Sequence, residues 1–135
     1  MLGWLFGKKG DGGRQSTRRI KLDGDGSYSQ EIVGESFYQS ALEQIAGPKA
    51  EDEKEFLCVA VLICESDNPH DENAVAVTIN GKKVGHLSRD DAVSWRRMLK
   101  KRLGYLPEVE LDAVIVGGWD DGISEGHYGV KLDLG

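Results

Sequence analysis

Short apolar runs, separated by residues that favour turns, predict β-strands along most of this chain. The clearest signal is a hairpin, because Asn80 and Gly81 stand between two strand-like runs and suit a type I′ turn. The last run alternates strictly, which is typical of a half-buried strand. The runs predicted as strands are residues 30–34, 56–65, 74–79, 82–87, 109–116 and 127–134, with a further short strand in residues 18–22.

Two segments show the spacing of helices instead. Tyr38, Leu42 and Ile45 repeat at helical intervals, and Gly47 followed by Pro48 ends that helix. Ser88 begins the second helix, with Asp91 three positions later as a capping box. Its expected buried stripe consists of Ala92, Trp95, Leu99 and Leu103, and Gly104 ends it.

The number and shortness of these elements predict the fold class. Five or six strands and two short helices leave little room for crossover connections, so we expect a mostly β protein: a small antiparallel OB-like barrel. A length of 135 residues indicates one domain. We expect residues 30–135 to form the barrel, and residues 1–29 to be a flexible N-terminal tail with an apolar tip.

The net charge of −6 is unevenly distributed. Residues 82–102 carry eight basic side chains against Asp90 and Asp91, so this stretch has an excess of positive charge. Two interpretations remain open: a solvated helix face, or a local site for a polyanion. The eight basic residues are Lys82, Lys83, Arg89, Arg96, Arg97, Lys100, Lys101 and Arg102.

Several classes of protein are disfavoured. No apolar run approaches the ~18 residues of a membrane span, so we expect none. Cys58 and Cys64 do not make a disulfide framework, which favours a reducing, cytoplasmic location, and both fit as inert, buried small residues. No nucleophile, phosphate-loop or zinc motif occurs. We therefore expect a protein that is not an enzyme and has no metal or cofactor.

One constellation of motifs is specific. The segment Gly34-Glu-Ser-Phe-Tyr-Gln39 precedes Asp67-Asn-Pro-His-Asp-Glu-Asn-Ala-Val-Ala-Val77, and the hairpin returns through Lys83-Val-Gly-His-Leu-Ser-Arg89. This order resembles the HIRAN domain, a module of Swi/Snf-type fork-remodelling helicases that also occurs as small free-standing proteins. The resemblance spans about residues 31–134.

The resemblance implies an OB-like barrel that, in the helicase members, holds the 3′ end of single-stranded DNA. By this analogy Phe37 or Tyr38 would stack on a base, and Asp71 would accept a hydrogen bond from the 3′-hydroxyl. Asn68 and His70 would orient the terminal sugar. Phosphates would meet Lys82, Lys83, His86 and Arg89, with Arg96 of the basic helix. The implied partners are single-stranded DNA and a repair or replication protein.

The sequence departs from the helicase pattern at Ser36, where those members carry an arginine, and at His70, where they carry a tyrosine. Each site residue also has a structural interpretation. Asn68, Asp71 and Asn73 suit Asx turns within the loop. Tyr38 suits a half-buried position and His86 an inward one, while Lys82 and Lys83 suit a soluble hairpin tip.

Two other functions stay open. In the first, the domain is a protein-interaction adaptor that has lost end binding, and its docking element is the apolar tip of Leu2, Trp4, Leu5 and Phe6. In the second, Asp67, Asp71 and His86 surround a metal in a small hydrolase.

Overall fold

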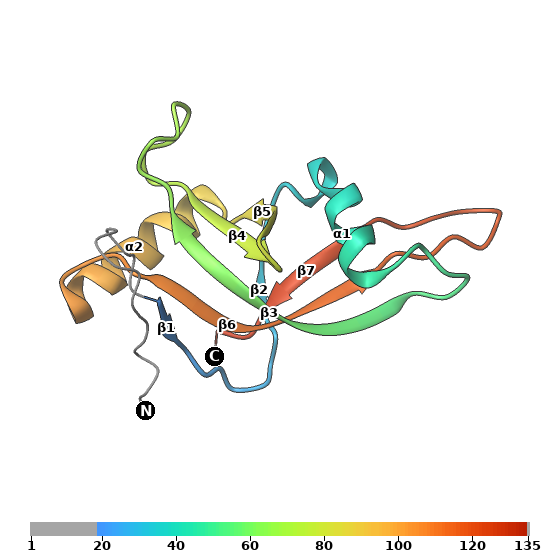
Figure 1. Ribbon diagram of the computed structural model, residues 1–135, viewed down its shortest axis with the longest axis horizontal. Coiled ribbons are helices and arrows are strands. Elements are labelled where there is room, and N and C mark those ends of the chain that lie inside the picture. Colours follow the sequence, from blue (N-terminus) through green and yellow to red (C-terminus); the bar gives the residue numbers. More distant parts are fainter. Residues whose placement is uncertain (1–18, 135) are drawn as a thin grey trace, which may run out of the picture.

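The computed structural model describes residues 19–134, and in them the chain folds into one curled sheet with two α-helices and a short 3₁₀ helix (Figure 1). The predicted mostly β class is confirmed. Counting two very short strands, the described sheet has seven rather than five or six. The elements are β1 (Arg19–Lys21), β2 (Gln30–Glu31), η2 (Glu35–Phe37), α1 (Gln39–Ala46), β3 (Lys54–Cys64), β4 (Val75–Ile79), β5 (Lys82–His86), α2 (Arg89–Leu103), β6 (Glu108–Gly117) and β7 (Tyr128–Leu132).

The sheet has the order β2-β7-β6-β3-β4-β5, and these neighbours are antiparallel. β1 is the exception, since it lies parallel to the start of β6. The two ends of this curled half-barrel meet just after β2, where Val33 and His86 exchange backbone hydrogen bonds of 2.8 and 2.9 Å. A Cβ on Gly85 would lie 2.7 Å from the carbonyl oxygen of Val33, so this approach requires glycine.

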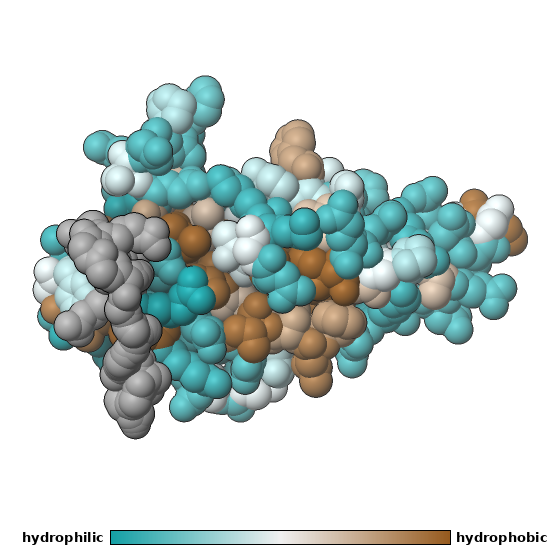
Figure 2. Space-filling model, viewed as in Figure 1, coloured by the Kyte–Doolittle hydropathy of each residue, from teal (hydrophilic) through white to brown (hydrophobic). Residues whose placement is uncertain are grey.

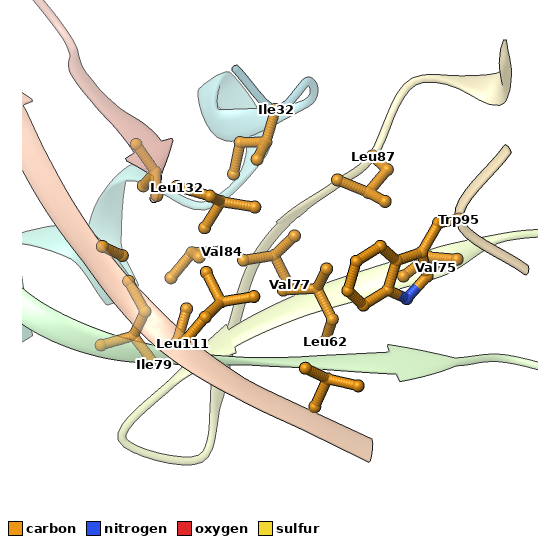
Figure 3. Close-up of a cluster of buried hydrophobic side chains, with 14 of the residues drawn as sticks. Ile32, Leu62, Val75, Val77, Ile79, Val84, Leu87, Trp95, Leu111 and Leu132 are labelled. Carbon is orange, nitrogen blue, oxygen red and sulfur yellow. The ribbon is translucent and has the colours of Figure 1, made fainter. Parts of the chain in front are cut away.

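The core lies inside the curve of the sheet (Figure 3), and Ala92, Trp95 and Leu99 of α2 belong to it. Apolar side chains from β3, β4, β5, β6 and β7 meet there, because alternate residues of each strand point to the same face. Leu62, Val77 and Leu111 are fully buried, and Trp95 of α2 lies against Val75 at one end. The predicted stripe of α2 is buried except for Leu103, which is 42% exposed.

The predicted turn and the predicted ends of α2 are confirmed, but the carboxylate of Asp91 accepts a hydrogen bond from Gln30 and does not complete the capping box. Asn80 and Gly81 both have positive φ, 53° and 76°, as a type I′ turn requires. The hydroxyl of Ser88 accepts a 3.1 Å hydrogen bond from the amide of Asp91 at the start of α2. Gly104, at φ 84°, ends that helix.

The sequence led us to place the start of the folded region at residue 30. The structure shows that it begins earlier. Ile20 of β1 packs against the core, and the carboxylate of Asp133, the one buried charged side chain in residues 19–134, accepts 2.9 and 3.0 Å hydrogen bonds from the amide of Gly26. Residues 19–29 therefore belong to the domain. The expected apolar tip of the chain lies outside the described residues.

The strand predicted for residues 56–65 forms as β3 and is half-buried, although its uninterrupted apolar sequence is typical of a fully buried strand. β3 is longer than predicted, and Ala60 and Leu62 are its fully buried residues. Leu57 and Val59 point to the opposite face and are exposed. None of the described helices is long and apolar enough to cross a membrane.

Candidate nucleic-acid interface

The loop between β3 and β4, residues 65–74, carries the most specific motif of the sequence and is built by its own side chains. The side-chain oxygen of Asn68 accepts hydrogen bonds from the amides of His70 (2.8 Å) and Asp71 (3.2 Å). One carboxylate oxygen of Asp71 accepts from the amide of Asn73 at 2.9 Å. Both residues make the Asx turns that their type favours, so they determine the shape of the loop.

Glu65, at the base of this loop, links it to β5. One carboxylate oxygen of Glu65 lies 2.6 Å from the ammonium group of Lys83. The other lies 3.1 Å from the side-chain amide of Asn68 and 3.1 Å from Nε2 of His86. Because a carboxylate only accepts, the imidazole donates through Nε2. Glu65 thus joins two separate parts of the motif, the loop and the returning strand.

The electrostatics of Glu65 follow from these contacts. Burial alone would raise the pKa of this carboxyl, but the hydrogen bonds from Lys83, Asn68 and His86 outweigh it and lower the pKa to about 2. The same contact raises the pKa of Lys83. Glu65 is therefore ionised at neutral pH, and its charge offsets that of Lys83.

Arg96 holds the loop onto α2. Its guanidinium donates hydrogen bonds to three backbone carbonyls: those of Glu65 (2.6 Å), Ala74 (2.9 Å) and Asn73 (2.8 Å). These carbonyls lie at the two ends of the loop, which also pair directly with each other through a 2.9 Å bond from the amide of Glu65 to the carbonyl of Ala74. Arg96, expected as a phosphate ligand, is thus occupied in fixing the loop.

Phe37 and Tyr38 lie on and just after η2, which packs beside β5. Phe37 is 84% exposed, an unusual position for a large aromatic side chain. Tyr38 is half-buried, as its helical spacing suggested, and lies close enough to influence the pKa of Lys83. In Figure 1 the loop (green to yellow) and η2 (cyan) project toward the same side of the molecule. The structure thus places these aromatic residues next to β5, the strand whose Lys83 and His86 contact Glu65.

Lys82 and Arg89, the other basic residues predicted to contact phosphates, are exposed. Lys82 stands at the tip of the hairpin, and Arg89 begins α2. Residues seven and eleven positions apart lie on one side of an α-helix, so Arg89, Arg96 and Lys100 form one stripe. Because Arg96 reaches the loop, this stripe runs beside it. Among residues 19–134, no hydrogen bond or salt bridge engages the side chains of Arg89 and Lys100.

The predicted site residues divide into two groups. Asn68, Lys83, His86 and Arg96 are engaged in contacts within the protein. Phe37, His70, Lys82 and Arg89 face solvent, and Asp71 has one carboxylate oxygen that makes no hydrogen bond within the described residues. Sequence reasoning missed Glu65, which organises the first group. An ionisable residue directly after an apolar strand and before the motif was the available signal.

Residues 19–134 contain no assembled site for thiol or metal chemistry. Burial, with a smaller effect of Asp112, raises the pKa of Cys58 to about 11, and burial also raises the pKa of Cys64. Both thiols therefore stay protonated at neutral pH. Within residues 19–134, no three side chains of the metal-ligating types come together. In comparisons with known proteins, no family model, curated protein or solved structure matches this chain.

Proposed function

We propose that this protein is a HIRAN-like module that binds single-stranded DNA and recognises its 3′-hydroxyl end without catalysing a reaction. The convergence of the three motif segments supports this proposal. These segments are far apart in sequence, yet the loop contacts β5 through Glu65 and residues 34–39 pack against the same strand. Residues that only shaped a loop would not account for the exposed aromatic side chain of Phe37 on η2.

The observation that carries the proposal is the exposure of Phe37. Burying this ring in the core would stabilise the fold, yet it is 84% exposed at the end of η2. A flat aromatic face in that position suits an unpaired base, and stacking is worth ~1–3 kcal/mol per base. Tyr38 follows directly, on the side of Lys83.

The loop supplies the chemistry that would select an end. One carboxylate oxygen of Asp71 accepts from the amide of Asn73, and the other makes no hydrogen bond within residues 19–134. That oxygen can accept a hydrogen bond from a terminal hydroxyl, whereas it repels a phosphate. Asp67 and Glu72, both exposed on the same loop, add to the repulsion. In this proposal the terminal sugar lies at the loop and the strand leaves toward the cations.

Those cations are Arg89 and Lys100 on α2, with Lys82 on the hairpin tip. Lys83 and His86 are paired with Glu65, so they position the loop and leave the phosphates to the exposed cations. Ser36 stands where the helicase members carry an arginine, and the charge of Lys83 is offset by Glu65. Few uncompensated positive charges therefore remain near the proposed position of the 3′ end. The proposal therefore includes modest affinity with a moderate dependence on salt.

Fluorescence anisotropy with short single strands tests this proposal. Phe37→Ala should weaken binding by about 1–3 kcal/mol, or roughly 5- to 150-fold. Ile123→Ala is the matched control, because Ile123 is 95% exposed on the β6–β7 hairpin and belongs to none of the motif segments. Equal affinity of the two variants would remove the stacking role. If the unchanged protein binds no strand at all, the adaptor alternative is favoured.

A further inference from the structure

The outer face of β3 carries an apolar strip. Leu57 and Val59 are 71% and 43% exposed, and the half-buried Val61 and Ile63 continue the same face. Val114 of β6 lies directly opposite Leu57 but is only 7% exposed, so the open part of this face is on β3. Figure 2 shows apolar side chains gathered over the middle of the sheet, where β3 and β6 run. Leu57, Val59, Val61 and Ile63 are called the outer strip below.

The sequence of β3 is that of a strand covered on both faces. Residues 56–64 are apolar without interruption, whereas a strand with one face in water normally alternates. The inner face of β3 meets the core through Ala60 and Leu62, so the alternation is missing because the outer face is apolar too. This composition indicates that another segment covers the outer strip.

The start of the same chain has the matching composition. Five of its first six residues are large and apolar: Met1, Leu2, Trp4, Leu5 and Phe6. The chain enters the described structure at Arg19, in the strand β1 that pairs with β6. Leu57 is two strands away and six residues along, which corresponds to ~22 Å across the sheet. The twelve residues from 7 to 18 reach up to ~40 Å, so the distance is well within range.

Charges of both signs surround the outer strip. Glu110 and Asp112 lie opposite Val61 and Val59, while Lys21 lies opposite Glu110 and Lys131 lies opposite Val114. Charge therefore does not select the occupant, and the choice of residues 2–6 depends on their apolar composition and on the length of the tether.

We propose that residues 2–6 of this chain pack onto the outer strip of β3. A tether of twelve residues makes this an intramolecular contact, with an effective concentration in the millimolar range. The tethered segment therefore has an advantage over an untethered partner of the same chemistry. This proposal is independent of the proposed function, because the outer strip does not include the motif loop or η2.

Nuclear magnetic resonance on the full chain tests the contact directly. We expect nuclear Overhauser effects between the indole of Trp4 and the methyl groups of Leu57 and Val59, unchanged by tenfold dilution. Leu57→Ser should shift the Trp4 indole N–H resonance, and Ile123→Ser, a matched change on the β6–β7 hairpin, should not. Both positions are largely exposed, so both variants should fold.

Two results would overturn the proposal. Absence of these effects in the full chain, with no shift in Leu57→Ser, would show that residues 2–6 do not cover the strip. Effects that appear only between differently labelled molecules in a mixed sample would assign the strip to a second copy. Effects within one molecule support the proposal.

Discussion

Arg96 of α2 donates a 2.6 Å hydrogen bond to the backbone carbonyl of Glu65, thirty-one positions earlier in the chain. The side chain of Glu65 in turn contacts Lys83, His86 and Asn68. One residue therefore receives contacts from the helix through its backbone and from the strand and loop through its carboxylate. The shape of the motif loop depends on both halves of this arrangement.

Removing the guanidinium of Arg96 should loosen the loop of residues 65–74. In Arg96→Met three backbone carbonyls lose the guanidinium as a donor, and within residues 19–134 only that of Ala74 keeps another, the amide of Glu65. We expect a loss of about 1–3 kcal/mol in the free energy of unfolding. Urea denaturation measures this change. Arg97→Met is the matched control, since Arg97 is exposed on the same helix and should change stability by less than about 0.5 kcal/mol. Equal effects would contradict the positioning role of Arg96.

Acid should destabilise the fold through Glu65. The pKa of this carboxyl is lowered from 4.5 to about 2, so its contribution is complete above pH 4.5 and is lost as the pH falls toward 2. We expect about 1–2 kcal/mol from this group, less than full linkage gives, because Lys83 is partly exposed.

Urea denaturation between pH 6 and pH 2 measures the contribution of Glu65. Glu65→Gln should flatten the decline in stability over that range, while Glu72→Gln, which removes an exposed carboxylate of the same loop, should leave it unchanged. Identical profiles for the two variants would show that Glu65 does not carry the effect.

A feature could be predicted from the sequence when the residues that determine it are close together in the chain. Asn80-Gly81 and Ser88 with Asp91 determine their turn and cap through neighbours two or three residues away, so local sequence was sufficient. The role of Gly85 depends on the approach of Val33, which is distant in sequence. The central place of Glu65 also depends on Lys83, His86 and Arg96, which are distant in sequence. The position of Glu65 after an apolar strand marks it as a candidate, but local sequence does not identify these partners, so the loop residues were found and their organiser was missed.

The stripe on α2 makes a separate prediction about salt. If Arg89 and Lys100 contact phosphates, replacing each by alanine should reduce the slope of log affinity against log salt by about 0.7 per lost contact. Lys101→Ala is the control, because Lys101 is exposed one position away from Lys100 and points off the stripe. Anisotropy titrations at several salt concentrations give the slopes. An unchanged slope in the double variant would place the phosphates elsewhere.

The central claim, recognition of a 3′-hydroxyl end, is tested by comparing two strands that differ only in their 3′ group. Because the unengaged oxygen of Asp71 accepts hydrogen bonds and repels phosphate, the 3′-hydroxyl strand should bind more tightly than the 3′-phosphate strand by about 1.5–3 kcal/mol. Asp71→Asn should narrow this gap, since the amide removes the negative charge. A clear preference for the hydroxyl strand, measured by anisotropy, is the result that the account predicts. Equal affinity of the unchanged protein for both strands would contradict it.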